Sequence, residues 1–314
     1  MNSDHFDGIH FFNPGAPQAF GFGAVLRWKL SSRPTPWITP PPQPPTVPAP
    51  AVDGSVCRVT LVNHSTVLIQ HAGQNILTDP VWSERISPVS WAGPRRKAPP
   101  GVRFEDLPHI STVLLSHNHY DHLDLPTLRR LHARHAPRFI VPLGVAALLQ
   151  RNGMKVDAEL DWWQSTGPIT CMPARHFSAR SLTDRNRTLW CSYWIETPAG
   201  PIYFAADTGF GPHFAEIRAR FGSPRLALLP IGAYKPEWFM SPVHISPAQA
   251  VEAHLILQPQ RSLAIHWGTF QLADDGADEP RQDLLHALAK HPTVPPFEAL
   301  PNGGTLHLGP SILS

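Results

Sequence analysis

The sequence predicts an α/β domain that runs from about residue 55 to residue 314. Short apolar runs of strand length alternate with segments that carry helix signals, as expected where helices pack on the faces of sheets. No internal repeat is present, so the segment is interpreted as one unit rather than a stacked array. Hydrophobic residues make up 42% of the chain and charged residues 16%, a composition typical of a globular protein.

The first predicted strands lie at the start of this domain. Val56–Val62 and Ser65–Gln70 flank an Asn-His turn, and Gln74–Thr78 follows a glycine turn. This spacing predicts three successive antiparallel strands. Thr112–Ser116 is a short apolar run that stops at His117. We expect it to be a buried strand that delivers side chains to a site at its end.

Helix signals and further apolar runs follow along the chain. Asp124 is expected to cap a helix that has Pro126 in its first turn. Ser246–Gln249 has the pattern of a capping box, which predicts a helix running to Leu257. Six more strands are expected at Phe139–Val141, Ile169–Met172, Ser192–Glu196, Ile202–Ala206, Leu226–Leu229 and Ser262–His266.

Residues 1–54 are predicted to be an N-terminal extension ahead of this domain. Its first part is rich in aromatic residues, namely Phe6, Phe11, Phe12, Phe20, Phe22 and Trp28. We expect this segment to pack on the main domain, or on an apolar surface beyond it. Residues 34–50 contain nine prolines, which predicts an extended strap rather than helix or sheet.

Composition also bounds the partners and the compartment. The formal charge of +2 offers little attraction for nucleic acid. The three cysteines are widely spaced, which argues against a disulfide framework and suits a reducing compartment. The N-terminus lacks the basic and apolar pattern of a secretory signal, and the longest apolar stretch is too short to span a membrane. We therefore expect a cytoplasmic protein, with peripheral contact to a membrane left open.

Four metal-binding side chains fall within six residues directly after a predicted strand: His117, His119, Asp121 and His122. Three further residues of the same kind end other predicted strands, namely His176, Asp207 and His266. Imidazole and carboxylate ligands together suit zinc, iron or manganese. Seven such residues are what two metal ions that share a bridging carboxylate require. The pattern therefore predicts a metal-dependent hydrolase with a two-metal centre.

The order His-x-His-x-Asp-His, followed by His, Asp and His at strand ends, resembles the metallo-β-lactamase superfamily. Within it, the sequence is most similar to the N-acyl-phosphatidylethanolamine-hydrolysing phospholipase D group. The resembling stretches are His117–Asp124, Gly232–Tyr234, Trp238–Met240, Ile265–Phe270, Thr78–Pro80, Asp207–Gly209 and Asn13–Pro14.

This resemblance implies an αβ/βα sandwich, two mixed β-sheets flanked by helices, with two divalent metals at one edge. Zinc is the metal it favours, and it is compatible with a homodimer. One metal would be held by His117, His119 and His176, and the other by Asp121, His122 and His266, with Asp207 bridging.

The implied substrate is N-acylated phosphatidylethanolamine or a related glycerophospholipid. A metal-bridged hydroxide would be the nucleophile, and Asp121 and Asp207 would belong to the catalytic set. The metal residues alone fit a second reading equally well, a lactonase or other carboxylic-ester hydrolase on the same fold.

Four more residues are expected to support the centre. His244 precedes a predicted helix, where it would contact a substrate phosphate or protonate the leaving group. Asp79 and His64 are expected to hydrogen-bond to metal-ligating side chains and fix their orientation. Asp124 would either do the same or serve as the helix cap described above.

Overall fold

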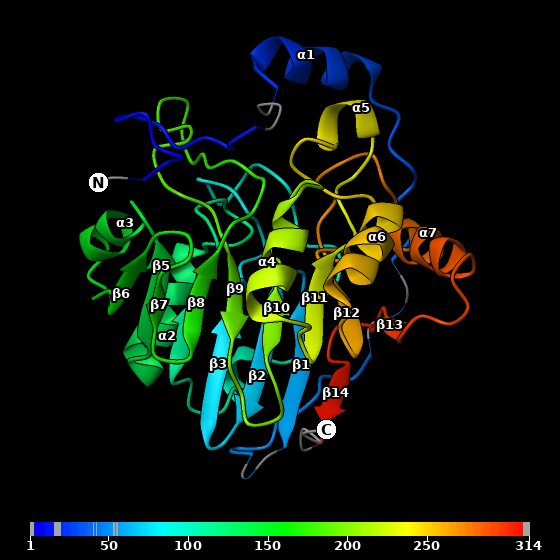
Figure 1. Ribbon diagram of the computed structural model, residues 1–314. Coiled ribbons are helices and arrows are strands. Elements are labelled where there is room, and N and C mark those ends of the chain that lie inside the picture. The colour runs from blue at the N-terminus through cyan, green and yellow to red at the C-terminus, as the bar shows by residue number, and fades with distance from the viewer. Residues whose placement is uncertain are drawn as a thin grey trace.

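The computed structural model describes residues 3–15, 20–39, 41, 43–52, 54 and 56–309. Two seven-stranded sheets face each other, and helices cover their outer faces (Figure 1). This arrangement is the αβ/βα sandwich, so the predicted fold class is confirmed. No helix in these ranges has both the length and the apolar character needed to cross a membrane.

The first sheet contains the strands that begin and end the main domain. In spatial order its strands are β14 (Thr305–Leu308), β1 (Cys57–Asn63), β2 (Thr66–His71), β3 (Gln74–Thr78), β4 (Thr112–Leu114), β5 (Arg138–Pro142) and β6 (Ala158–Leu160). The pairs from β14 to β3 are antiparallel, and those from β3 to β6 are parallel.

The second sheet is built from the later part of the chain. Its spatial order is β13 (Phe297–Glu298), β12 (Arg261–Ile265), β11 (Leu226–Pro230), β10 (Ile202–Phe204), β9 (Ser192–Ile195), β8 (Ile169–Met172) and β7 (Ser165–Thr166). The pairs from β10 to β13 are parallel. Parallel strands point their carboxyl ends to one edge, so residues that follow β10 and β12 are brought together there.

Helices pack against the outer face of each sheet. The helices are α1 (Phe22–Ser31), α2 (Leu125–His135), α3 (Ala146–Arg151), α4 (His213–Phe221), α5 (Glu237–Met240), α6 (Pro247–Leu257) and α7 (Glu279–Leu288), with a 3₁₀ turn at Phe104–Asp106. Apolar residues of α2 and α3 join a core cluster with the first sheet, and those of α4, α6 and α7 join one with the second. Helices α1 and α5 lie apart from both layers, at one end of the molecule (Figure 1).

The core between the sheets follows the alternation of strand side chains. Val67 and Ile69 of β2 face the other sheet, whereas Leu68 between them packs under the helices of the first sheet. Both faces of these strands are therefore buried, and the strands appear in the sequence as continuous apolar runs. Tyr193 and Trp194 of β9 are likewise core residues, as their place in a predicted strand suggested.

Several predicted elements agree with the structure to the residue. The strands Gln74–Thr78 and Ile169–Met172 have the predicted bounds. The capping box at the start of α6 is confirmed, since the Ser246 hydroxyl accepts from the Gln249 backbone N–H and the Gln249 side chain accepts from the Ser246 N–H. The predicted cap of α2 is wrong in part: Asp124 occupies the N-cap position, but its side chain makes no capping hydrogen bond.

The N-terminal extension packs on the main domain. Phe11 is buried in a cluster with Trp190, and Trp28 of α1 is buried in a cluster with Met240 of α5. The strap is tied down by backbone bonds, including one of 2.7 Å from the Thr46 N–H to the Gly101 carbonyl. The aromatic segment therefore packs as expected, while Pro40, Pro42 and the side chain of Phe22 lie outside the described residues.

Candidate metal centre

The loop after β4 carries the first four predicted ligands, and a buried carboxylate anchors it. Asp79, at the end of β3, accepts from the Ser116 backbone N–H at 2.7 Å and from the Ser116 hydroxyl at 2.6 Å. Its Oδ2 atom also lies 2.7 Å from Nδ1 of His122. Because Asp79 fixes both the start of the loop and the His122 ring, the Nε2 atom of His122 is turned toward the cluster.

Three histidines form one group of nitrogen donors. The Nε2 atom of His117 lies 2.8 Å from Nδ1 of His119, which in turn lies 3.2 Å from Nε2 of His176. His176 directs its Nδ1 at the carbonyl of Val243, 2.9 Å away, so its Nε2 is left as a lone-pair donor. Burial holds the pKa of His117 and of His176 well below the ordinary value. Neutral imidazoles that converge in this way suit a cation.

A second group contains a carboxylate. The Oδ2 atom of Asp121 lies 3.3 Å from Nε2 of His122 and 3.5 Å from Nε2 of His266. His64 adds a third ring nitrogen, its Nε2 atom at 3.0 Å from the same oxygen. These four side chains are brought close enough to hold one ion.

Asp207 lies between the two groups. Its Oδ2 atom is 3.1 Å from Nε2 of His266 and 3.2 Å from Nε2 of His122, and it is 3.8 Å from Nε2 of His176 in the first group. The strand β10 ends just before it, and Ala206 has a φ of 52° that turns the chain toward the cluster. One carboxylate within reach of both donor groups is what a bridging ligand requires.

The donor atoms fit divalent metal ions. The Oδ1 atom of Asp207 is buried without a hydrogen-bond partner, which is costly unless a ligand engages it. Burial raises the pKa of Asp121 and of Asp207, but the neighbouring histidines outweigh burial and hold both pKa values well below the ordinary one. Ionised carboxylates and imidazoles without thiolate suit zinc, iron or manganese.

The supporting residues predicted from the sequence have different outcomes. Asp79 contacts His122, and His64 contacts Asp121 and lies with its ring 4.0 Å from that of His266, as expected of positioning residues. Asp124 does not: its carboxylate accepts from Trp82, Ser83 and Thr127, and so holds the loop after β3.

An arginine far along the chain also contacts the metal loop. The Nη1 atom of Arg180 donates to the carbonyls of Asn118 at 2.7 Å and Leu123 at 2.8 Å. Its guanidinium also lies 3.9 Å from the centroid of the Tyr120 ring. Arg180 therefore braces the metal loop from within. Distance along the chain hid this contact, which no sequence motif signals.

A cavity of about 290 Å³ opens beside the donor atoms. This volume is close to the lower limit for small-molecule sites. Its lining includes His119, Asp121, Asp207 and His244, whose Nδ1 atom lies 3.9 Å from Oδ2 of Asp207. The rest of the lining is mostly apolar and comes from distant segments: Phe20, Val25, Trp28, Phe177, Arg185, Phe239, Met240, Val243 and Leu272. The aromatic extension and α5 thus form one wall of this cavity, a role that the sequence did not reveal.

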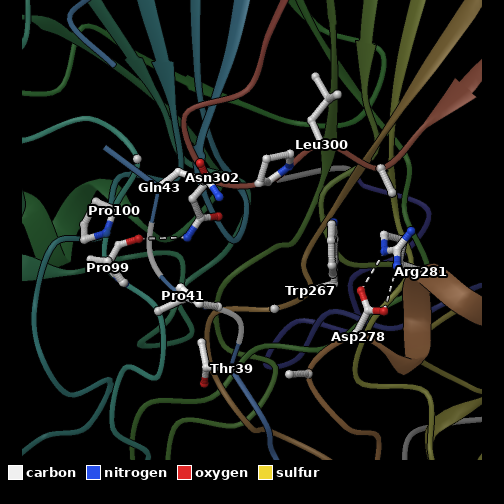
Figure 2. Close-up of a pocket in the computed structure, with 16 residues that line it drawn as sticks. Thr39, Pro41, Gln43, Pro99, Pro100, Trp267, Asp278, Arg281, Leu300 and Asn302 are labelled. Atoms are coloured by element: carbon white, nitrogen blue, oxygen red, sulfur yellow. Dashed lines mark hydrogen bonds and ion pairs between the residues drawn. The ribbon is translucent and has the colours of Figure 1, made fainter. Parts of the chain in front are cut away.

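A second cavity has a volume of about 400 Å³ (Figure 2). It is bordered by Trp267, Leu300 and Pro41, and the ion pair between Asp278 and Arg281 lies at its side. None of the seven predicted metal ligands lines it. It is therefore separate from the candidate site.

The fold and this donor cluster together define a metallo-hydrolase of the αβ/βα-sandwich class. The family model described as a beta-lactamase superfamily domain matches residues 74–267, which is more than half of the chain. The chain therefore belongs to this superfamily, and the hydrolase class inferred from the sequence is confirmed.

Comparisons with known proteins agree with this placement. A protein of Mycobacterium tuberculosis with no described function is 44% identical over 252 residues, 77% of this chain and 67% of that protein. The N-acyl-phosphatidylethanolamine-hydrolyzing phospholipase D 1 of Caenorhabditis elegans is 39% identical over 241 residues, 72% of this chain and 68% of that protein. The structure of Igni18, a metallo hydrolase from Ignicoccus hospitalis, matches with a TM-score of 0.60 and 20% sequence identity. The match covers 80% of this chain and 98% of that one, and this similarity supports the fold alone.

The contact between Asp79 and His122 leads to a testable prediction. Asp79→Asn replaces the charged acceptor of His122 Nδ1 by a neutral amide, which weakens the orientation and basicity of that ring. We expect the affinity for Zn²⁺ to fall by roughly 10- to 100-fold, measured by competition with a chromogenic chelator.

Asp124→Asn is the matched control, because it changes a buried carboxylate of the same region that contacts none of the histidines. It is expected to lower the melting temperature but to leave Zn²⁺ affinity unchanged. Equal losses of affinity in both variants would show that Asp79 acts only through general stability.

Proposed function

We propose that the protein is a zinc-dependent phosphodiesterase of phospholipase D type, acting on N-acylated phosphatidylethanolamine or a related glycerophospholipid. The observation that carries this proposal is the cavity itself, which is lined both by donor side chains of the cluster and by aromatic and aliphatic side chains. A phospholipid has the matching halves, a phosphodiester and an acyl chain. The relative in Caenorhabditis elegans that bears such a name supports the same substrate class.

The donor groups assign the metal ligands in this proposal. His117, His119 and His176 would hold one ion, and Asp121, His122 and His266 the other, with Asp207 shared between them. Two divalent ions, when bound, would supply Lewis-acid stabilisation of phosphoryl charge and a water with a pKa lowered to about 7.

The chain's own residues orient the reaction. Asp79 fixes the imidazole of His122, and the Val243 carbonyl fixes that of His176. Arg180 holds the metal loop through the Asn118 carbonyl. His244 lines the cavity beside Asp207 and faces the space that a phosphodiester would occupy. We assign it the transfer of a proton to the oxygen of the departing alcohol, or a hydrogen bond to a phosphoryl oxygen. The extension of residues 1–54 would complete the acyl-binding wall through Phe20, Val25 and Trp28.

Hydrolysis of a defined lipid tests the proposal. Zinc-loaded protein is expected to convert N-palmitoyl-phosphatidylethanolamine in detergent micelles to phosphatidic acid and N-palmitoylethanolamine, both detected by mass spectrometry. A panel of lactones and carboxylic esters is assayed in parallel. If the protein opens a lactone while it leaves the phospholipid intact, the proposed substrate class is wrong, and the enzyme is an ester hydrolase on this fold.

A further inference from the structure

An arginine lies in the wall of the metal cavity. Among the described residues that line this cavity, Arg185 alone has a guanidinium or ammonium group, and Asp121 and Asp207 supply the carboxylates. The Arg185 side chain is exposed to solvent, and an arginine keeps its positive charge at any physiological pH. The cavity therefore offers a permanent positive charge besides its metal-binding atoms.

The loop between β8 and β9 fixes the position of Arg185. Asp184 accepts from the Arg180 backbone N–H at 2.9 Å, which closes a turn directly before Arg185. Directly after it, Asn186 has a φ of 57°, and its carbonyl accepts from the Phe11 N–H at 2.8 Å. Because the backbone is held on both sides, the Arg185 side chain starts from a defined place at the cavity wall.

The ring of Phe177 connects Arg185 with the donor cluster. The Arg185 guanidinium lies 4.7 Å from the centroid of this ring, and the ring centroid of His119 lies 4.6 Å from the same point. Phe177 itself belongs to the cavity lining. The guanidinium and a metal-binding imidazole thus contact one aromatic ring, so a single ligand of small-molecule size can reach both.

The charges of the proposed centre balance before Arg185 is counted. Two divalent cations bring four positive charges. Asp121 and Asp207, which are ionised because the neighbouring histidines hold both pKa values well below the ordinary one, bring two negative charges. A hydroxide and a phosphodiester bring one negative charge each. Arg185 adds a further positive charge, so a substrate with a second anionic group complements the cavity better than one with the phosphodiester alone.

The chemistry of a phospholipid decides where this second anionic group lies. The diacylglycerol half has no ionisable group, so the anion must belong to the headgroup alcohol. We propose that Arg185 is a specificity residue that pairs with a carboxylate of the headgroup, and that the preferred substrate is an N-acylated phospholipid of the phosphoserine type. Guanidinium and carboxylate form paired, charge-assisted hydrogen bonds of defined geometry. The inference rests on the proposed function and names the headgroup for it.

Two lipids that differ by one carboxylate test this role. N-palmitoyl-phosphatidylserine and N-palmitoyl-phosphatidylethanolamine are presented to the zinc-loaded, full-length protein in micelles of neutral detergent. Water adds across the bond between phosphorus and the headgroup oxygen, so both lipids give phosphatidic acid, together with N-palmitoylserine or N-palmitoylethanolamine. We expect kcat/KM to be about tenfold higher for the serine lipid, the size of effect of one charge-assisted hydrogen bond.

The variant Arg185→Gln should act on one lipid only. Its kcat/KM for the serine lipid is expected to fall by about tenfold, mainly through a higher KM, because the carboxylate contact is the same in the bound substrate and in the transition state. The value for the ethanolamine lipid should stay within about twofold. Arg185→Lys keeps the charge but not the paired geometry, so it should retain part of the preference.

Arg187→Gln is the matched control for Arg185→Gln. Arg187 is exposed in the same loop but is not among the residues that line the metal cavity. Its substitution should leave kcat/KM unchanged for both lipids. Melting temperatures are measured as well, because Arg185 also donates to the Phe20 carbonyl at 3.4 Å, and loss of that contact alone would affect both lipids alike.

Binding of two soluble ligands tests the same contact without phospholipid cleavage. N-acetyl-O-phosphoserine and N-acetyl-O-phosphoethanolamine differ by the same carboxylate, and their affinities for the zinc-loaded protein are measured by isothermal titration calorimetry. The serine compound is expected to bind about tenfold more tightly to the unaltered protein, and both compounds should bind equally to Arg185→Gln.

The outcomes separate this inference from the proposed function. Equal kcat/KM values for the two lipids, equal losses on both in Arg185→Gln, or a serine preference that survives in that variant would contradict the role of Arg185 and leave the phospholipase activity standing. If neither lipid is cleaved but the soluble serine compound is preferred through Arg185, the specificity contact is supported and the proposed function alone is wrong.

Discussion

Asp207→Asn is expected to reduce kcat by at least about a thousandfold while the fold is retained. Asp207 lies within 3.2 Å of His122 and His266 and 3.8 Å from His176, so it is the side chain that reaches both donor groups. Asparagine keeps the shape but removes the negative charge that two cations would share. Metal catalysis contributes several kcal/mol to transition-state stabilisation, and each 1.36 kcal/mol is worth a factor of ten in rate. Turnover of phospholipid and bound metal are both measured.

The control for this variant is Asp275→Asn, a second buried carboxylate outside the donor cluster, where it accepts from the Ala233 N–H. We expect it to retain turnover within roughly threefold, because Asp275 is not one of the donor side chains and asparagine keeps an oxygen that can accept from the Ala233 N–H. If Asp207→Asn stays within tenfold of the unaltered enzyme, Asp207 is not a shared ligand.

Gly232→Ala is expected to have the second largest effect. A Cβ atom at this position would lie 2.1 Å from the carbonyl oxygen of His266 and 3.3 Å from Cα of Trp267, so the loop after β11 and the segment after β12 must separate. Because His266 belongs to the donor cluster, we expect kcat/KM to fall by about 100-fold, the loss that a displacement near 1 Å produces. Steady-state kinetics and urea unfolding are measured together.

Gly153→Ala is the control for Gly232→Ala, because it lowers stability without displacing His266. Gly153 has a φ of +77° and nothing within 4 Å of its added Cβ, so alanine there is strained without touching the site. It should lower the free energy of unfolding by about 1 kcal/mol and leave kcat/KM unchanged. If both glycine variants lose activity in proportion to stability, the close approach of Gly232 to His266 has no specific role.

The donor cluster was predictable because each member has a local signal. His117 to His122 share one loop after an apolar run, and Asp207 and His266 each follow a strand that the sequence also showed. Parallel strands gather their carboxyl ends, so the order of elements was enough to expect convergence. The three antiparallel strands before Asp79 were visible for a similar reason, since their apolar runs are bounded by turns.

Other features depend on contacts that the sequence does not encode locally. The strands β7 and β13 contain two residues each and carry no period, so no pattern could reveal them. The contact of Arg180 with the carbonyls of Asn118 and Leu123 spans about sixty positions, and no local pattern in the sequence indicates it. The packing of α1 over the cavity likewise needed the tertiary structure, although the aromatic content of the segment indicated an apolar partner.

The metal content of the protein tests the central claim most directly. Protein stripped with a chelator, reloaded with Zn²⁺ and freed of excess metal is analysed by inductively coupled plasma mass spectrometry. Two donor groups joined by Asp207 predict two ions per chain in the unaltered protein. The variant His176→Ala removes one ligand of the first group, so it is expected to keep one tightly held ion per chain. A content of one ion or fewer per chain at full turnover would contradict the two-metal centre.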